Sequence, residues 1–207
     1  MSHDIYPEEG GIASISAYLP DSVTSFTDVT VTLLELSNEL NGITEPPVAT
    51  VDTYTSLDDD GYVEIEDYRS FYVALEQHAT PEHLEAVIRA IGRHAGESNI
   101  STLHAFLPRA IGNVTLNLLT TPLVTADGLK SQLQERVGLT LLTIQEAING
   151  DRPPIAKVNL VDLAYDNRQS EGEIQFSVEI LPDTSIDQVA QAAQTTLDHI
   201  EHVKAQS

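Results

Sequence analysis

The sequence predicts an α+β fold in which helices flank a small antiparallel sheet, and three patterns indicate it. Apolar and polar residues alternate over 173–181, which is typical of a strand with one buried face. Apolar residues then recur at helical spacing over 186–200, which predicts an amphipathic helix. A second β-rich run at 155–165, joined to the first by polar residues 166–172, completes a C-terminal strand–turn–strand–helix unit.

The charge of the chain sets limits on its environment and partners. The 207 residues include 32 acidic and 10 basic ones, and the formal net charge is −22. This charge argues against nucleic acid, whose phosphates need clustered cations, and against an anionic membrane surface. Only three of the basic residues are Lys. An acid-rich, Lys-poor composition is typical of proteins from salt-loving archaea, and an ordinary acidic protein is the alternative.

The composition and the termini bear on the compartment. The chain contains no Cys, which excludes disulfides and thiolate metal sites. The N-terminus lacks a basic and apolar export signal, and no apolar run has the length that spans a bilayer. We therefore expect a cytoplasmic protein or, for a viral chain, a virion protein assembled in the host cytoplasm.

Three parts are expected along the chain. Residues 1–11 are polar and end in Gly-Gly, which predicts an N-terminal arm that is ordered by a neighbouring subunit. Residues 12–152 predict a lobe of mixed helices and hairpins. The Pro153-Pro154 pair predicts the boundary to the C-terminal unit, residues 153–207.

Local signals mark the elements of the middle lobe. Thr80, Pro81 and Glu82 supply a capping hydroxyl, a proline at the first helical position and an acid near the positive end of the dipole, which predict a helix ending at Gly96. The other elements expected are a strand over 12–19, a helix over 25–40, paired strands over 48–57 and 62–66, and a strand or helix start over 71–77.

Breaking residues shape the rest of this lobe. The apolar stretch 99–119 is interrupted by Pro108 and Gly112, which predicts a short helix, a turn, and then a strand or second short helix. Gly138 predicts a break between a helix that opens at 125–127 and another over 140–148.

An acidic turn is the candidate for a bound metal. Residues 56–67 partly resemble an EF-hand calcium loop, with Gly61 at the sharp turn. Ser56 stands where the first acidic ligand belongs, and Pro46-Pro47 occupies the place of the incoming helix. The alternative is a solvated acidic hairpin turn. The oxygen ligands of the calcium candidate would be Asp58, Asp60, Glu64 and Asp67.

No motif in the chain indicates catalysis. His199 and His202 have the spacing of a zinc pair, but a solvated pair near a helix C-terminus, favoured by the dipole, explains them better. The sequence has no G-x-S-x-G, no phosphate-binding glycine loop and no H-E-x-x-H. We therefore predict no catalytic residue and no cofactor, and we expect that the protein is not an enzyme.

The C-terminal unit resembles the C-terminal part of baseplate J-like wedge proteins of tailed viruses, over about a quarter of the chain. The resemblance implies a virion structural role and carries over no catalytic residue. The matching residues are Ile174, Phe176, Val178, Ile180, Pro182, Asp183, Ile186, Val189, Ala192, Ala193 and Leu197.

Three roles follow from these patterns. The first is a tail, neck or baseplate component of a virus of a halophilic archaeon, which acts through interfaces with its own copies and with other virion proteins. The second is a cytosolic halophilic protein with a small-molecule function. The third is a calcium-dependent binding module, which would explain only the acidic turn.

Overall fold

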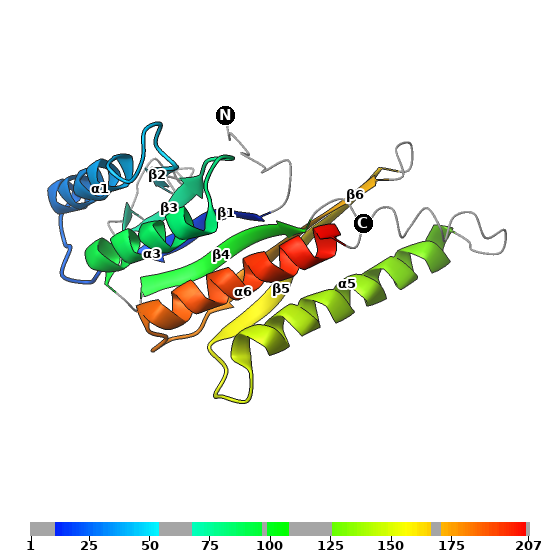
Figure 1. The fold of residues 1–207 in the computed structure, drawn as a ribbon. Coiled ribbons are helices and arrows are strands. Elements are labelled where there is room, and N and C mark those ends of the chain that lie inside the picture. The colour runs from blue at the N-terminus through cyan, green and yellow to red at the C-terminus, as the bar shows by residue number, and fades with distance from the viewer. Residues whose placement is uncertain (1–10, 54–67, 97–98, 108–125, 167–170, 206–207) are drawn as a thin grey trace, which may run out of the picture.

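One antiparallel sheet of six strands and four helices make up the described part of this computed structural model (Figure 1). The described residues are 11–53, 68–96, 99–107, 126–166 and 171–205. The predicted α+β class is confirmed. In chain order the elements are β1 (Gly11–Tyr18), α1 (Phe26–Asn41), β2 (Ala49–Thr53), β3 (Ser70–Leu75), α3 (Pro81–Ala95), β4 (Ile100–Leu107), α5 (Ala126–Asn149), β5 (Ala156–Asp166), β6 (Glu171–Ile180) and α6 (Ile186–Ala205).

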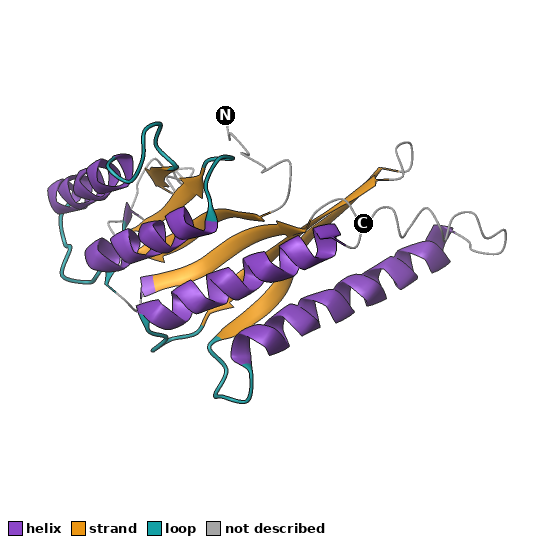
Figure 2. Ribbon diagram, viewed as in Figure 1, coloured by secondary structure: helices purple, strands orange, loops and turns teal. Residues whose placement is uncertain are grey.

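The sheet and the helices form two layers (Figure 2). The strand order is β2-β3-β1-β4-β6-β5, and every neighbouring pair is antiparallel. The helices follow the order α1, α3, α6, α5, with each packed against the next. Because β4 pairs with β6, strands from the middle lobe and from the C-terminal unit lie in the same sheet.

The core lies between these two layers, and β6 shows how the sequence builds it. Ile174, Phe176, Val178 and Ile180 are buried, while Gln175 and Glu179 between them are more exposed. This alternation confirms the predicted strand and its facing. The hairpin with β5 and the helix that follows it are also confirmed. The same pattern in β3 buries Phe71, Val73 and Leu75, which confirms the strand alternative for 71–77.

The helices begin where side chains can satisfy free backbone N–H groups. Thr80 Oγ1 accepts from the His83 N–H at 3.5 Å, and His83 Nδ1 accepts from the Thr80 N–H at 3.2 Å. This reciprocal cap, with Pro81 after it, confirms the predicted start of α3. Ser25 caps α1 in a similar way, with its hydroxyl accepting from the Asp28 N–H at 3.1 Å.

The prediction of a short helix at the start of 99–119 is wrong. Residues 100–107 form β4, which lies between β1 and β6 in the middle of the sheet. Consecutive residues of its C-terminal half, from Ala105 to Leu107, are buried. A strand buried on both faces shows a continuous apolar run, which periodicity cannot separate from a helix. The rest of the predicted segment lies outside the described residues.

The predicted helix break at Gly138 is also wrong. α5 continues through this residue from Ala126 to Asn149. A glycine inside a helix costs only about 1 kcal/mol relative to alanine. Burial of Val137, Leu141 and Ile144 on one side of α5 outweighs that cost.

A second glycine sets the spacing of two helices. A Cβ atom built on Gly92 of α3 would lie 2.7 Å from Cδ1 of Ile186, at the start of α6. A side chain at this position would require Ile186 to move, so glycine allows this packing of Ile186 against α3. The predicted hairpin partner at 62–66 lies outside the described residues, and so does the predicted arm at 1–11 except for Gly11. In the described sheet, β2 pairs with β3.

Candidate functional site

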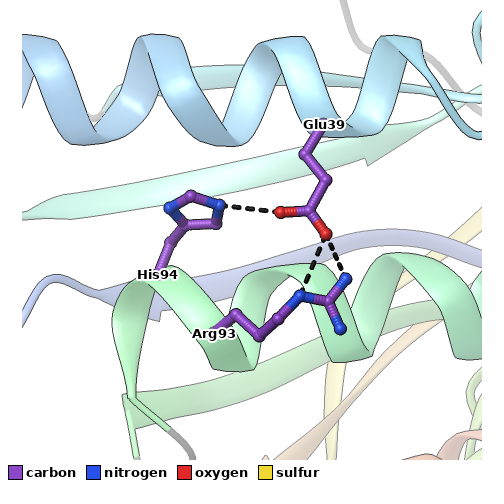
Figure 3. A network of polar contacts seen from close by, with 3 residues as sticks. All are labelled: Glu39, Arg93 and His94. Atoms are coloured by element: carbon purple, nitrogen blue, oxygen red, sulfur yellow. Dashed lines mark hydrogen bonds and ion pairs between the residues drawn. The ribbon is translucent and has the colours of Figure 1, made fainter.

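A charged cluster connects the first two helices of the layer (Figure 3). Glu39 of α1 lies between Arg93 and His94 of α3. Arg93 Nε donates to Glu39 Oε1 at 3.0 Å, Arg93 Nη2 contacts the same oxygen, and His94 Nε2 lies 2.8 Å from Oε2. The hydrogen bond from Arg93, with a smaller one from His94, lowers the pKa of Glu39 although burial opposes this. Since the carboxylate already binds both neighbours, the cluster attaches α1 to α3.

A serine and a histidine meet on the sheet face opposite the helices. Ser16 Oγ of β1 lies 3.2 Å from His104 Nε2 of β4, and burial lowers the pKa of His104. The two positions are 88 residues apart, so no local signal in the sequence pointed to them. Nucleophilic catalysis needs a base that a third group orients. Within the described residues no carboxylate is bonded to His104.

The helix layer contains a shallow groove. It lies between α3 and α6, encloses about 400 Å³ and includes Leu84 and Ile88 in its lining. Arg89 on its border binds Glu85 at 3.0 Å and Asp187 at 3.1 Å. Because two carboxylates already neutralise this arginine, the groove has little charge left to bind an anionic ligand.

The described residues hold no group of three or more His, Asp or Glu side chains that could bind a metal ion. Asp58, Asp60, Glu64 and Asp67 of the weak calcium candidate lie outside the residues described, so the expectation of a solvated acidic turn without tight calcium binding stays a prediction. His199 Nδ1 lies 3.0 Å from the carbonyl oxygen of Thr195, one turn earlier in α6. This contact is local to α6, and the preference for a solvated pair over a zinc pair at His199 and His202 stays a prediction.

Exposed apolar side chains gather where α5 lies along β5. We call Leu139, Leu142, Leu160 and Val161 the α5–β5 surface. These four side chains are between 43% and 60% exposed. Leu139 and Leu142 project away from the buried stripe of α5, while Leu160 and Val161 lie where a register shift interrupts the pairing of β5 with β6.

Side-chain amides hold β5 against α5. Asn149 Oδ1 accepts from the N–H groups of Ile155 and Ala156 at 2.9 and 3.0 Å, and its Nδ2 donates to the Ala156 carbonyl at 2.9 Å. One turn earlier, Gln145 Oε1 accepts from the Val158 N–H at 3.0 Å. Asn149 binds Ala156, and Gln145, which is earlier in α5, binds Val158, which is later in β5. The two elements therefore run antiparallel, as Figure 1 shows.

This arrangement brings the four apolar residues together. Leu142 lies one helical turn before Gln145, and Leu160 lies two residues beyond its partner Val158. Leu139 is one further turn along the same side of α5. The hydrogen bonds thus set Leu142 and Leu160 at a similar level along the two antiparallel elements. The α5–β5 surface is the set of exposed apolar side chains that α5 and β5 carry at the outer edge of the sheet.

The charge around this surface differs from that of the remaining chain. Residues 126–161 contain four acidic and four basic residues, whereas the whole chain has 32 and 10. The exposed charges described there are also balanced: Glu146 and Asp151 against Arg152 and Lys157. The α5–β5 surface is therefore apolar and lies in a part of a strongly acidic protein that has no net charge.

α1 has a second set of exposed apolar residues. Phe26, Val31 and Leu34 are each about half exposed. Phe26 contacts Tyr68 edge to face, with ring centroids 4.7 Å apart. α1 contains three acidic residues and no basic one, so its surface combines apolar groups with negative charge.

No protein family model, curated protein or solved structure matches the chain. None of the helices in the described segments combines the length and the apolar character needed to cross a membrane.

Proposed function

We propose that the chain is a structural subunit of a virus particle, a tail, neck or baseplate component that acts through contacts between subunits. The α5–β5 surface carries this proposal. Large apolar side chains that stay exposed together mark interaction sites, and the centres of protein interfaces are depleted of charged residues. Leu139, Leu142, Leu160 and Val161 meet both criteria.

The polar features of the described chain also favour assembly over catalysis. Glu39, Arg93 and His94 satisfy one another across two helices, and Arg89 is shared by two acids. These groups connect elements of the fold through their side chains. A scaffold that presents surfaces needs such internal connections, whereas an enzyme needs convergent groups in a cleft.

The acidic composition indicates the host. A net charge of −22 produces self-repulsion that molar salt screens, which fits a virus of a halophilic archaeon. The resemblance of residues 154–197 to baseplate wedge proteins supports a position in the tail or baseplate. On this proposal the partners are other virion proteins and further copies of the chain, assembled in the host cytoplasm.

Quantitative mass spectrometry of purified virus particles from the source tests the proposal. The expected result is that the chain is present at a fixed ratio to the major capsid protein through successive purification steps. A host ribosomal protein serves as the control, because its ratio should fall at each step. If the chain falls in parallel with that control and stays in the cell extract, it belongs to the cytosol and the proposal is wrong.

A further inference from the structure

We infer that the α5–β5 surface is where a second copy of this chain binds, so that the protein forms a homodimer through α5 and β5. The inference rests on the proposed function, because it names the partner of the same surface. The distribution of charge along the chain is the reason for choosing a second copy as the partner.

The charge distribution restricts where two copies can meet. Residues 1–125 contain 19 acidic and 4 basic residues, and residues 162–207 contain 9 and 2. The intervening segment 126–161 has no net charge. Contact through either of the acidic parts would bring like charges together, which opposes association. The α5–β5 surface is the part of the described fold where large apolar groups and charge balance coincide.

The balance of charge also favours a second copy over a foreign protein. In a twofold contact each element meets the same element of the partner, so the surface must be compatible with itself. A neutral apolar surface bordered by Glu146 and Lys157 meets this condition. A foreign partner selected by electrostatics would be basic, and it would bind the acidic parts of the molecule instead.

Side chains rather than strand pairing make this contact. The backbone groups of Ala156 and Val158 that face α5 already bind Asn149 and Gln145. Just beyond them, the pairing of β5 with β6 shifts register at Val161. Leu139, Leu142 and Leu160 are therefore the groups that the partner covers.

The test is the association of the full-length chain at about 2 M KCl, where charge repulsion is screened. Sedimentation equilibrium gives the dimer Kd of the wild type, of Leu139→Glu and of Leu34→Glu. The two leucines are matched: both lie in helices, Leu139 is 60% and Leu34 is 59% exposed, and each substitution adds one negative charge. Melting curves in the same buffer show whether both variants remain folded.

We expect Leu139→Glu to raise the dimer Kd at least about tenfold, which corresponds to about 1.4 kcal/mol. Leu34→Glu should change it less than about twofold, a difference below about 0.5 kcal/mol. Leu142→Glu is a second variant on the same surface and should behave like Leu139→Glu. Lower salt should weaken the wild-type dimer, since repulsion between the acidic parts is then less screened.

Three results would overturn the inference. The first is a wild-type chain that stays monomeric. The second is a dimer Kd that neither Leu139→Glu nor Leu142→Glu alters. The third is a Leu34→Glu variant that raises the dimer Kd as much as Leu139→Glu does, which would indicate general charge repulsion. Failure of the proposed function looks different. A chain that dimerises through Leu139 and is absent from virus particles refutes only the virion role, and a virion chain with an unaltered Kd in the variants refutes only the dimer contact.

Discussion

The two ends of the helix layer are attached to the fold by different chemistry. At one end, α1 is connected to α3 through an ion cluster in which Glu39 binds Arg93 and His94. At the other end, α5 is connected to β5 through the uncharged amides of Asn149 and Gln145. The first connection depends on protonation and ionic strength, whereas the second depends on neither.

The uncharged connection leaves the balance of four acidic and four basic residues in 126–161 unchanged. An ion cluster uses cations, which are scarce in this chain, and it places an acid beside each of them. Amides supply both donors and acceptors without charge, so they hold α5 in place and add nothing to the local potential. The neutral end therefore exposes its leucines among charges that balance one another. Four expected results test the contrast between the two ends.

The largest effect is expected for Phe176→Ala, which removes the core beneath both ends. Phe176 is buried between the sheet and the helices, and truncating a buried Phe costs about 3–5 kcal/mol. The measurement is the free energy of unfolding from denaturant titration in molar KCl. Val31→Ala is the control, because Val31 in α1 is 48% exposed and lies outside the α5–β5 surface, and it should cost less than about 1 kcal/mol. Similar losses in both variants would contradict the assigned core.

Asn149→Ala should disrupt the uncharged connection. It removes the partner of three backbone groups of Ile155 and Ala156, and we expect a loss of about 2 kcal/mol. The loss should be the same at pH 5 and pH 8, since no ionisable side chain takes part. Asn159→Ala is the control, because that amide makes only one long contact, 3.4 Å, to exposed Glu179. An unfolding free energy that Asn149→Ala leaves unchanged would mean that water replaces the amide without cost.

Glu39→Gln should disrupt the charged connection, by about 1 kcal/mol at neutral pH. The pKa of Glu39 is lowered in the folded state from its ordinary value of 4.5. Its stabilising effect is therefore present above that ordinary value and is lost as the pH falls through the lower, folded-state pKa. The wild type and the variant should converge in strongly acidic buffer. Glu35→Gln, on the exposed side of the same helix, removes equal charge and should show no such convergence; equal pH profiles for the two variants would contradict the role of Glu39.

The smallest effect is expected for Gly138→Ala, which should stabilise α5 by about 0.5–1 kcal/mol. A Cβ atom at this position has no neighbour within 4 Å. The same substitution at Gly92 serves as the comparison, because there the Cβ would lie 2.7 Å from Ile186 Cδ1, and the gain in helix propensity should be cancelled. Melting temperatures measured side by side decide this, and a stabilised Gly92→Ala would show that Ile186 moves aside freely.

Sequence patterns predicted the elements whose signals are local. The alternation around Phe176 lies within one strand, and the Thr80 cap with Pro81 lies within one turn, so each could be identified without knowing the tertiary fold. β4 could not be identified in this way. It is a central strand, and its apolar residues Ala105 to Leu107 face both sides of the sheet, which removes the alternation on which the prediction depends.

The connections at the two ends of the helix layer were beyond sequence reasoning for different reasons. Glu39 and Arg93 are 54 residues apart, and in a chain with 32 acids no single acid stands out. Asn149 is only 7 residues from Ala156, yet an asparagine before Gly150 has the pattern of an ordinary helix end. The α5–β5 surface could not be predicted from the sequence, because α5 carries apolar residues on more than one side and its exposed leucines cannot be distinguished from core residues.

The amides of Asn149 and Gln145 have a consequence for how large an assembly can become. An outer strand with free backbone groups recruits further strands and grows into fibres, a hazard that molar salt increases by favouring the burial of apolar surface. Here the N–H groups of Ala156 and Val158 and the Ala156 carbonyl are already bound within the chain, and the shifted pairing at Val161 bends the strand beyond them. Among the described strands the sheet thus ends at β5, and the bound groups of Ala156 and Val158 oppose the addition of a further strand along this stretch in concentrated brine.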